Sequence, residues 1–205
     1  MTIYLYDTDL PDGLDFGASV AVDSETMGLN PIRDRLCLVQ LSSGDGNAHL
    51  VQFKKGSDFN APNLKALMAN PKVTKFFHYA RFDLGVIYKY LGVMATPCYC
   101  TKIVSRITRT STDKHGLKNL CKELLGLDLA KQQQTSDWGA ETLSDAQKEY
   151  AASDVLYLHS LVKILDTLLE REGRTDLAQA MFEFLPTRSK LDLLGWADVD
   201  LFSHA

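Results

Sequence analysis

The sequence predicts one α/β domain in which a mixed β-sheet is flanked by helices on both faces. The chain has 205 residues, 45% of them hydrophobic, which is typical of a single domain with a large core. Short β-rich apolar segments come first, a strand–helix–strand pattern follows, and helical periodicity fills the second half. This order favours three sequential antiparallel strands joined to parallel strands in one mixed sheet.

The three antiparallel strands are expected near the N-terminus. Val20–Val22 is a short apolar segment, and Arg35–Leu41 and Ala48–Phe53 are longer and rich in β-forming residues. The sequence Gly-Asp-Gly-Asn at 44–47 lies between the last two segments and is typical of a hairpin turn. Asp23 is then expected just beyond the end of the first strand.

A strand–helix–strand unit is expected in the middle of the chain, after a short helix at Pro62–Met68. Val73–Phe77 predicts a buried strand, and Ala80–Leu91 has apolar residues at helical spacing. Gly92 follows this helix as its expected C-cap. A short strand around Cys98 completes the unit.

Helices account for the next part of the expected fold. One begins at Lys102, a second covers Gly116–Leu125, and the longest covers Ser144–Arg171. Ser144 is the expected N-cap of the longest helix, and Gln147, three residues later, completes a capping box.

The C-terminal region predicts one more helix and a tail. The helix covers Thr175–Phe184 and is expected to end before Pro186, because proline lacks the backbone donor that a helix needs. The segment Leu191–Phe202 is rather apolar for a terminus. We therefore expect residues 1–205 to form a single domain, with 186–205 a tail that docks on the domain or on a neighbouring subunit.

Composition excludes several classes of protein. Met1–Asp15 has acidic residues and no basic ones, unlike a signal peptide, and no apolar run approaches the roughly 18 residues of a membrane span. We expect a cytoplasmic protein with no membrane contact. No two of the four cysteines have Cys-x-x-Cys spacing, so we expect reduced thiols at Cys37, Cys98, Cys100 and Cys121.

The net charge of −4 argues against extensive non-specific binding of nucleic acid. The charge is uneven, because the region from Cys100 to Gln133 has more basic than acidic residues. Such a region is either a solvated helix face or a surface for phosphates.

Asp23 and Glu25 form the first candidate site, because residues two apart on an extended chain point to the same side. Carboxylate oxygens are the ligands that Mg²⁺ prefers, so this pair could bind one cation. With 26 acidic residues in the chain, the spacing also arises by chance. A surface turn is the alternative interpretation of this pair alone.

Two further acidic positions have equally plain alternatives. Asp83 falls in the first turn of an expected helix, where the helix dipole alone favours a carboxylate. His78, at the end of an apolar strand, is typical of a partly buried histidine. Tyr150 and Asp154 are four residues apart on an expected helix, so that a phenol and a carboxylate share one face. The alternative is a helix with one buried tyrosine and one exposed aspartate, since Tyr79 and Asp83 have the same spacing.

These residues fall in four segments: Val20–Leu29 (VAVDSETMGL), His78–Leu84 (HYARFDL), Ser136–Trp138 (SDW) and Leu143–Leu158 (LSDAQKEYAASDVLYL). In this order the segments resemble the DEDD exonuclease superfamily, in its tyrosine-bearing branch, as in ribonuclease D. The resemblance covers most of the chain, from about Val20 to Leu165. It implies a ribonuclease H-like sheet and 3′–5′ exonuclease activity.

Two features depart from ribonuclease D. Ser24 stands where the first motif of the family usually has threonine, and it keeps the hydroxyl. Ribonuclease D also has C-terminal helical RNA-binding domains, for which this chain has no room. A single domain with a short tail is similar to the bacterial nanoRNase C group, as are the segments Lys131–Trp138 and Leu191–Trp196. That group degrades very short RNA, including dinucleotides, and assembles into rings.

The resemblance implies two Mg²⁺ or Mn²⁺ ions in each active site, held by Asp23, Glu25, Asp83 and Asp154. Tyr150 would orient the attacking water or take its proton. The implied reaction is the hydrolysis of short single-stranded RNA, down to dinucleotides, from the 3′ end to nucleoside 5′-monophosphates.

Eight residues are candidates for substrate binding. Met27, Gly28 and Leu29 would form a wall against the terminal bases, and His78 would contact the scissile phosphate or the terminal sugar. Four basic residues are candidates for the backbone phosphates and the 5′-phosphate: Lys102, Arg109, Lys114 and His115.

Two alternatives stay open. An exonuclease for longer RNA or for DNA would share these motifs, and telling RNA from DNA needs a group that reads the 2′-hydroxyl. A non-catalytic RNA-binding module would have lost metal carboxylates, whereas this chain has all four. A homo-oligomer is expected in either case, because an apolar tail is typical of an assembly and a closed ring could enclose the site.

Overall fold

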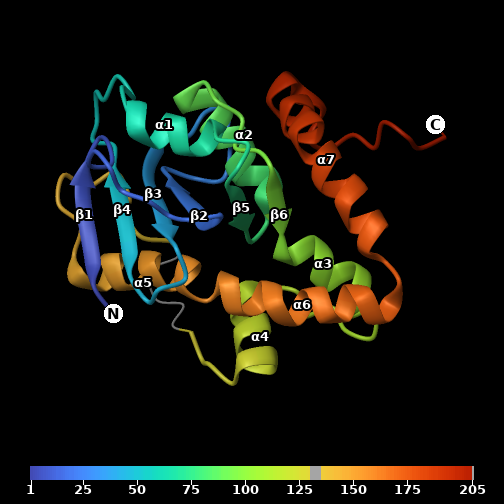
Figure 1. The fold of residues 1–205 in the computed structure, drawn as a ribbon. Helices are drawn as coiled ribbons and strands as arrows, with labels where there is room; N and C mark the ends of the chain where they lie inside the picture. The colour runs from blue at the N-terminus through green and yellow to red at the C-terminus, as the bar shows by residue number, and fades with distance from the viewer. Residues whose placement is uncertain (130–134, 205) are drawn as a thin grey trace.

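The computed structural model describes residues 1–129 and 135–204. Within them, six strands form one mixed sheet in the order β1-β4-β3-β2-β5-β6 (Figure 1). Parallel and antiparallel neighbours occur together and helices flank the sheet, which confirms the expected fold class. The segment 131–134, used above for the likeness to nanoRNase C, lies outside the described residues.

The expected antiparallel strands are β2 (Ser19–Thr26), β3 (Leu36–Ser42) and β4 (Ala48–Gln52). Two parallel strands continue the sheet beyond β2, namely β5 (Thr74–Phe77) and β6 (Cys98–Cys100). β2 is therefore central. It is longer than the expected segment Val20–Val22, so Asp23 and Glu25 lie within the strand and not beyond its end.

One strand was not expected from the sequence: β1 (Ile3–Asp7), which pairs in parallel with β4 at the edge of the sheet. An edge strand buries little of either face, and here Tyr4 and Leu5 are both exposed. Without a buried face, the strand lacks the alternation of apolar and polar residues by which strands are recognised.

The helices surround this sheet (Figure 1). They are α1 (Pro62–Ala69), α2 (Ala80–Leu91), α3 (Thr101–Thr108), α4 (Leu117–Leu120), α5 (Asp145–Leu156), α6 (Leu158–Glu172) and α7 (Thr175–Leu191). Two π-helical turns follow α4 and α7, namely η1 (Cys121–Leu125) and η2 (Asp192–Trp196). α5 packs across β2, β3 and β4, while α2 packs against the sheet and α7.

The expected helix ends are confirmed at two places. Ser144 and Gln147 form the capping box of α5, in which each side chain accepts from the backbone N–H of the other residue. Gly92 ends α2 in the left-handed conformation that glycine adopts without strain. The single helix expected over Ser144–Arg171 is wrong, because it bends at Tyr157 into α5 and α6. The bend lets α5 cover the sheet while α6 packs along α3.

Pro186 does not end a helix, contrary to the expectation, and α7 continues through it to Leu191. The carbonyl left without a helical partner by a proline is that of the residue four positions earlier, which is Phe182. Here the Cys98 thiol donates to the Phe182 oxygen at 3.6 Å. A substitute donor from β6 thus replaces part of the lost backbone hydrogen bond. The tail expected at 186–205 therefore begins within α7.

An ion cluster fastens the segment after α7 to the start of α2. The Asp192 carboxylate is buried and accepts from Arg81, with Arg81 Nη2 at 2.7 Å, and also pairs with Arg188 at 2.9 Å. Arg81 and Arg188 both donate to the Ala197 carbonyl as well. Because Arg81 lies in the first turn of α2, the cluster fixes the part of α2 that carries Asp83.

The four cysteines are all free and buried, as expected for reduced thiols. Among the helices in the described part of the chain, none has the length and apolar character needed to cross a membrane.

We predict that Asp192→Asn lowers the free energy of unfolding by about 2 kcal/mol, because two partly buried arginines lose their shared carboxylate. Urea unfolding followed by circular dichroism measures this change. Glu141→Gln is the matched control, since Glu141 is exposed and should change stability little. A loss below roughly 0.5 kcal/mol in Asp192→Asn would show that the cluster contributes nothing beyond a surface ion pair.

Candidate active site

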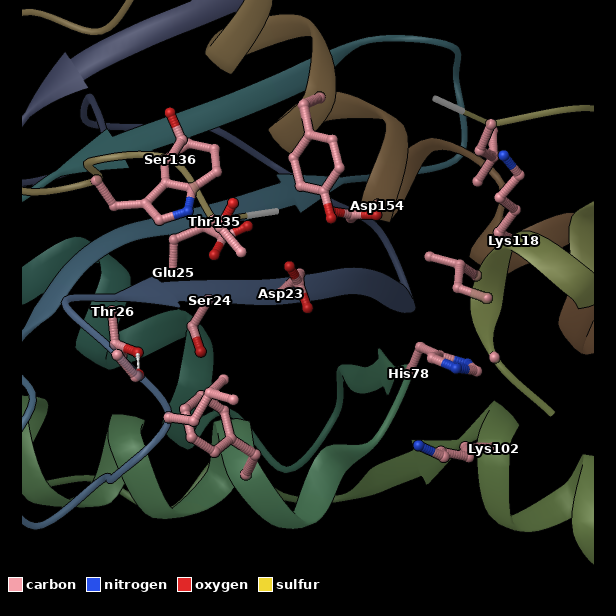
Figure 2. Close-up of a pocket in the computed structure, with 18 of the residues that line it drawn as sticks. Asp23, Ser24, Glu25, Thr26, His78, Lys102, Lys118, Thr135, Ser136 and Asp154 are labelled. Atoms are coloured by element: carbon pink, nitrogen blue, oxygen red, sulfur yellow. Dashed lines mark hydrogen bonds between the residues drawn. The ribbon is translucent and has the colours of Figure 1, made fainter. Parts of the chain in front are cut away.

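Three of the four predicted carboxylates meet in one cleft. Asp23 and Glu25 project from β2 and Asp154 from α5, and one oxygen of each lies within 4.8 Å of the others. Figure 2 shows these side chains in the middle of the cleft, with His78 and Lys102 together toward one end. The strand alternation thus places the β2 pair on one side, as the sequence predicts, and α5 crosses that side.

The fourth carboxylate, Asp83, lies apart from this group of three. It is 3% exposed in the first turn of α2, and Ser24 Oγ donates to Asp83 Oδ1 at 2.6 Å. Ser24 lies between Asp23 and Glu25 and points to the opposite face of β2. The hydroxyl in the middle of the first motif therefore holds Asp83 against the strand that carries the other two ligands.

Burial raises the pKa of every carboxyl in this cluster, and repulsion between carboxylates raises that of Glu25, Asp83 and Asp154 further. Burial raises the pKa of Asp23 to about 7. Burial, together with the charges of Asp23, Asp154 and Asp83, raises the pKa of Glu25 to about 10. The pKa values of Asp83 and Asp154 rise as well, first through burial and then through the charge of Asp23. Without a cation, the cluster therefore retains protons that exposed carboxyls would lose.

Tyr150 is four residues before Asp154 on α5, and both line the cleft as the helical spacing predicts. Burial raises the pKa of the Tyr150 phenol, and the charges of Asp154, Glu25 and Asp23 raise it further. Trp138 supports the Tyr150 ring, with the ring centroids 6.0 Å apart. Tyr150 is therefore a protonated hydrogen-bond donor beside the carboxylates.

The cleft has a volume of about 690 Å³, in the range of small-molecule sites. Five of the predicted substrate-binding residues line it: Met27, Gly28, Leu29, His78 and Lys102. Leu29 is 90% exposed, so its side chain is free to contact a bound group.

The other three predicted contacts do not line the cleft. Arg109 pairs with Glu123 and donates to Ser105 Oγ at 3.1 Å and to the Lys114 carbonyl at 3.1 Å. His115 Nδ1 lies 2.9 Å from the same Ser105 Oγ. These residues thus form a local network between α3 and α4, which occupies the Arg109 guanidinium.

Several cleft residues were not predicted as substrate contacts, among them Lys118, Asn119, Thr135, Ser136 and Trp138. Lys118 belongs to the basic region noted in the sequence. It lies in the short helix α4, whereas Lys114 precedes that helix and does not line the cleft. Trp138 is part of one of the four family segments, but sequence spacing alone gives it no role.

Comparison with known proteins identifies the family. Residues 10–170 match the family described as 3′–5′ exonuclease. The chain belongs to this family. Ribonuclease D of Gluconacetobacter diazotrophicus, one relative, is 36% identical over 157 residues, which are 77% of this chain and 39% of that protein. The chain therefore spans about two fifths of the length of the curated ribonuclease D relatives that it matches.

Two solved structures of NrnC from Brucella melitensis resemble this chain over its whole length. NrnC with bound Mg²⁺ is 53% identical with a TM-score of 0.95, and the match covers 100% of both chains. NrnC bound to pGG is 54% identical with a TM-score of 0.96, again over 100% of both chains. These likenesses confirm the resemblance to ribonuclease D and to the nanoRNase C group.

The donor set of the exonuclease cleft fits a divalent metal. Carboxylate oxygens are hard ligands of the kind that Mg²⁺ and Mn²⁺ take, and three of them converge here. A cation would also remove the repulsion that raises the pKa values of these groups.

We predict that the metal-free protein becomes less stable as the pH rises from 5 to 8. The raised pKa of Asp23, about 7, and of Glu25, about 10, mean that the folded state binds more protons than the unfolded state above roughly pH 4. Deprotonation therefore favours unfolding. Glu25→Gln should raise the unfolding temperature at pH 8 in chelator by roughly 4 to 8 °C, equivalent to about 2 kcal/mol.

Differential scanning calorimetry in excess chelator measures this effect. Glu149→Gln is the control, because Glu149 lies on the same helix as Asp154 but is exposed. If stability rises between pH 5 and pH 8, or if Glu25→Gln is destabilising at pH 8, the carboxylates are not held under mutual repulsion.

Proposed function

We propose that this protein is a 3′–5′ exoribonuclease that hydrolyses short RNA, down to dinucleotides, to nucleoside 5′-monophosphates. The observation that carries the proposal is the group of three carboxylates within 4.8 Å in a cleft of a 3′–5′ exonuclease domain. Full-length likeness to NrnC bound to pGG supports the preference for short RNA.

Two Mg²⁺ or Mn²⁺ ions are the proposed cofactors. Asp23 and Asp154 would hold one ion, and Asp23, Glu25 and Asp83 the other, while Ser24 keeps Asp83 in reach. Bound cations would make a coordinated water more acidic and stabilise the charge on the leaving 3′-oxygen. The Mg²⁺ in the NrnC structure supports this assignment.

Tyr150 is the proposed orienting group for the attacking water. The phenol would orient that water or take its proton, because cations bound by the neighbouring carboxylates would offset the charges that raise its pKa. Trp138 and the α5 backbone hold the ring, so the hydroxyl has a fixed position beside Asp154.

His78 is the proposed reader of the 2′-hydroxyl. Thr101 Oγ1 donates its one hydrogen to the Phe77 carbonyl at 3.1 Å, so it accepts from His78 Nδ1 at 2.9 Å. Burial, with the nearby Lys102 charge, lowers the pKa of His78 to about 3, so the ring is neutral and Nε2 is a bare acceptor. Nε2 is buried without a protein partner among the described residues. Because Nε2 can only accept, it would repel a phosphate oxygen, whereas a ribose hydroxyl can donate a hydrogen bond to it.

Lys102 and Lys118 are the proposed contacts for the phosphates of the substrate, including its 5′-phosphate. Both line the cleft, and the Lys102 ammonium lies 4.4 Å from the Tyr79 ring centroid, which fixes the side chain. Their positive charges would oppose the field of the carboxylates.

We also propose a homo-oligomer, with a ring as the expected form, in the cytoplasm. The segment after α7 leaves apolar side chains exposed, with Leu194 at 70% and Phe202 at 83%. Such side chains at the end of a chain are typical of a subunit interface. The buried free thiols suit a reducing compartment.

Cleavage of 5′-labelled RNAs from two to about twenty nucleotides tests the proposed function. We predict fastest cleavage of dinucleotides with Mg²⁺, no cleavage in excess chelator, and at least a hundred-fold loss in Asp154→Asn, because removal of one metal-binding charge prevents assembly of the site. Glu149→Gln is the matched control. Equal rates at all lengths would refute the short-RNA preference, and full activity in chelator would refute the metal mechanism.

We predict that His78→Phe lowers kcat/KM on a ribo-dinucleotide about 10-fold, the effect of one lost hydrogen bond of about 1.4 kcal/mol. The same change should have little effect on a dinucleotide with a 2′-deoxy terminal sugar. His115→Phe is the control, because His115 lies outside the cleft. An equal loss on both dinucleotides would assign His78 to another atom of the substrate.

A further inference from the structure

The indole N–H of Trp138 is a buried donor in the wall of the cleft. Trp138 is 3% exposed and lines the cleft, and its Nε1 has no hydrogen-bond partner among the described residues. Indole nitrogen can only donate. A buried donor without a partner costs about 1–3 kcal/mol of stability. Such a donor is therefore expected to have an acceptor outside the protein, such as a ligand or a water molecule.

The loop around Trp138 is fixed by three side chains from other parts of the fold. Gln147 Nε2 donates to the Asp137 carbonyl at 3.0 Å, and Gln52 Nε2 donates to the Ala140 carbonyl at 2.9 Å. Arg35 Nη2 donates to the Gly139 carbonyl at 3.4 Å. The backbone on both sides of Trp138 is thus tied to the sheet and to α5.

Close packing restricts the same loop on its cleft side. A Cβ at Gly139 would lie 2.3 Å from Met27 Sδ, so a larger residue here would displace the methionine side chain that lines the cleft. Trp138 belongs to a buried apolar cluster with Cys37, Leu38, Leu50, Leu143 and Ala151, and the Tyr150 ring packs against it. Trp138 therefore packs against apolar side chains and also borders the polar cleft.

We propose that Trp138 is a substrate-contacting residue whose indole N–H donates to an oxygen of the bound nucleotide. The inference rests on the proposed function and adds a donor to it. Three carboxyl groups lie in this cleft, where a lysine or arginine would form ion pairs with them. The indole N–H carries no charge, so it can donate to a phosphate or sugar oxygen without forming such an ion pair. The cleft then has two buried groups without a hydrogen-bond partner among the described residues. His78 Nε2 can accept from a bound nucleotide, and Trp138 Nε1 can donate to it.

The chain has two tryptophans, so protein labelled with ¹⁵N at the indole gives two N–H resonances. Trp196→Phe assigns them. On addition of guanosine 5′-monophosphate with Mg²⁺, the Trp138 proton should move downfield, as an N–H does when it gains an acceptor. The Trp196 resonance should stay in place, because Trp196 lies in η2, outside the cleft.

Trp138→Phe keeps an aromatic ring and removes the donor. It should weaken the affinity for guanosine 5′-monophosphate about 10-fold, the equivalent of one hydrogen bond of about 1.4 kcal/mol. Guanosine, 2′-deoxyguanosine 5′-monophosphate and inorganic phosphate, each titrated with Mg²⁺, identify the accepting oxygen. A shift with phosphate but not with guanosine assigns it to the phosphate, and the reverse assigns it to the sugar.

Two results would overturn the inference while leaving the proposed function intact. In one, the nucleotide binds and raises the unfolding temperature, but the Trp138 resonance does not move. In the other, Mg²⁺ alone shifts the Trp138 resonance as far as Mg²⁺ with nucleotide does, which would mean that a protein carboxylate accepts from the indole N–H. A protein that binds no nucleotide under these conditions would overturn the proposed function, and this inference with it.

Discussion

Repulsion among partly buried carboxylates is the interaction on which the rest of this structure depends. Asp23, Glu25 and Asp154 meet in one cleft, and Asp83 lies buried beside them, held by a hydrogen bond from Ser24. Like charges this close retain protons unless something positive comes between them. Among the described residues, no lysine or arginine forms an ion pair with these carboxylates, which leaves the position between them open for a divalent cation.

The scaffold holds the carboxylates by polar contacts that carry no charge of their own. Ser24 donates to Asp83, and Gln40, directly opposite Asp23 on β3, donates to Asp23 at 3.5 Å. Gln147 makes two kinds of contact. It completes the capping box that starts α5, and its side chain donates a hydrogen bond to the loop that carries Trp138. The helix that carries Asp154 and the loop beside it are therefore set by one side chain.

The sequence was sufficient where a local rule decides the structure, and insufficient where a distant contact overrides it. Extended spacing placed Asp23 and Glu25 on one side, and helical spacing did the same for Tyr150 and Asp154. The rule for Pro186 failed because a thiol on β6 replaces the missing donor, a contact that no local pattern reveals. The basic residue Arg109 was expected in the cleft, but it is engaged by Glu123 outside it.

The most direct test of the account is to locate bound metal in a crystal of the full chain soaked with Mn²⁺, by anomalous diffraction. We expect Mn²⁺ coordinated by oxygens of Asp23, Glu25 and Asp154, with Asp83 drawn toward a second ion. In Asp154→Asn, this density should be lost. Mn²⁺ bound elsewhere, or no ion between these carboxylates at saturating metal, would contradict the central claim that the buried charges form a metal centre.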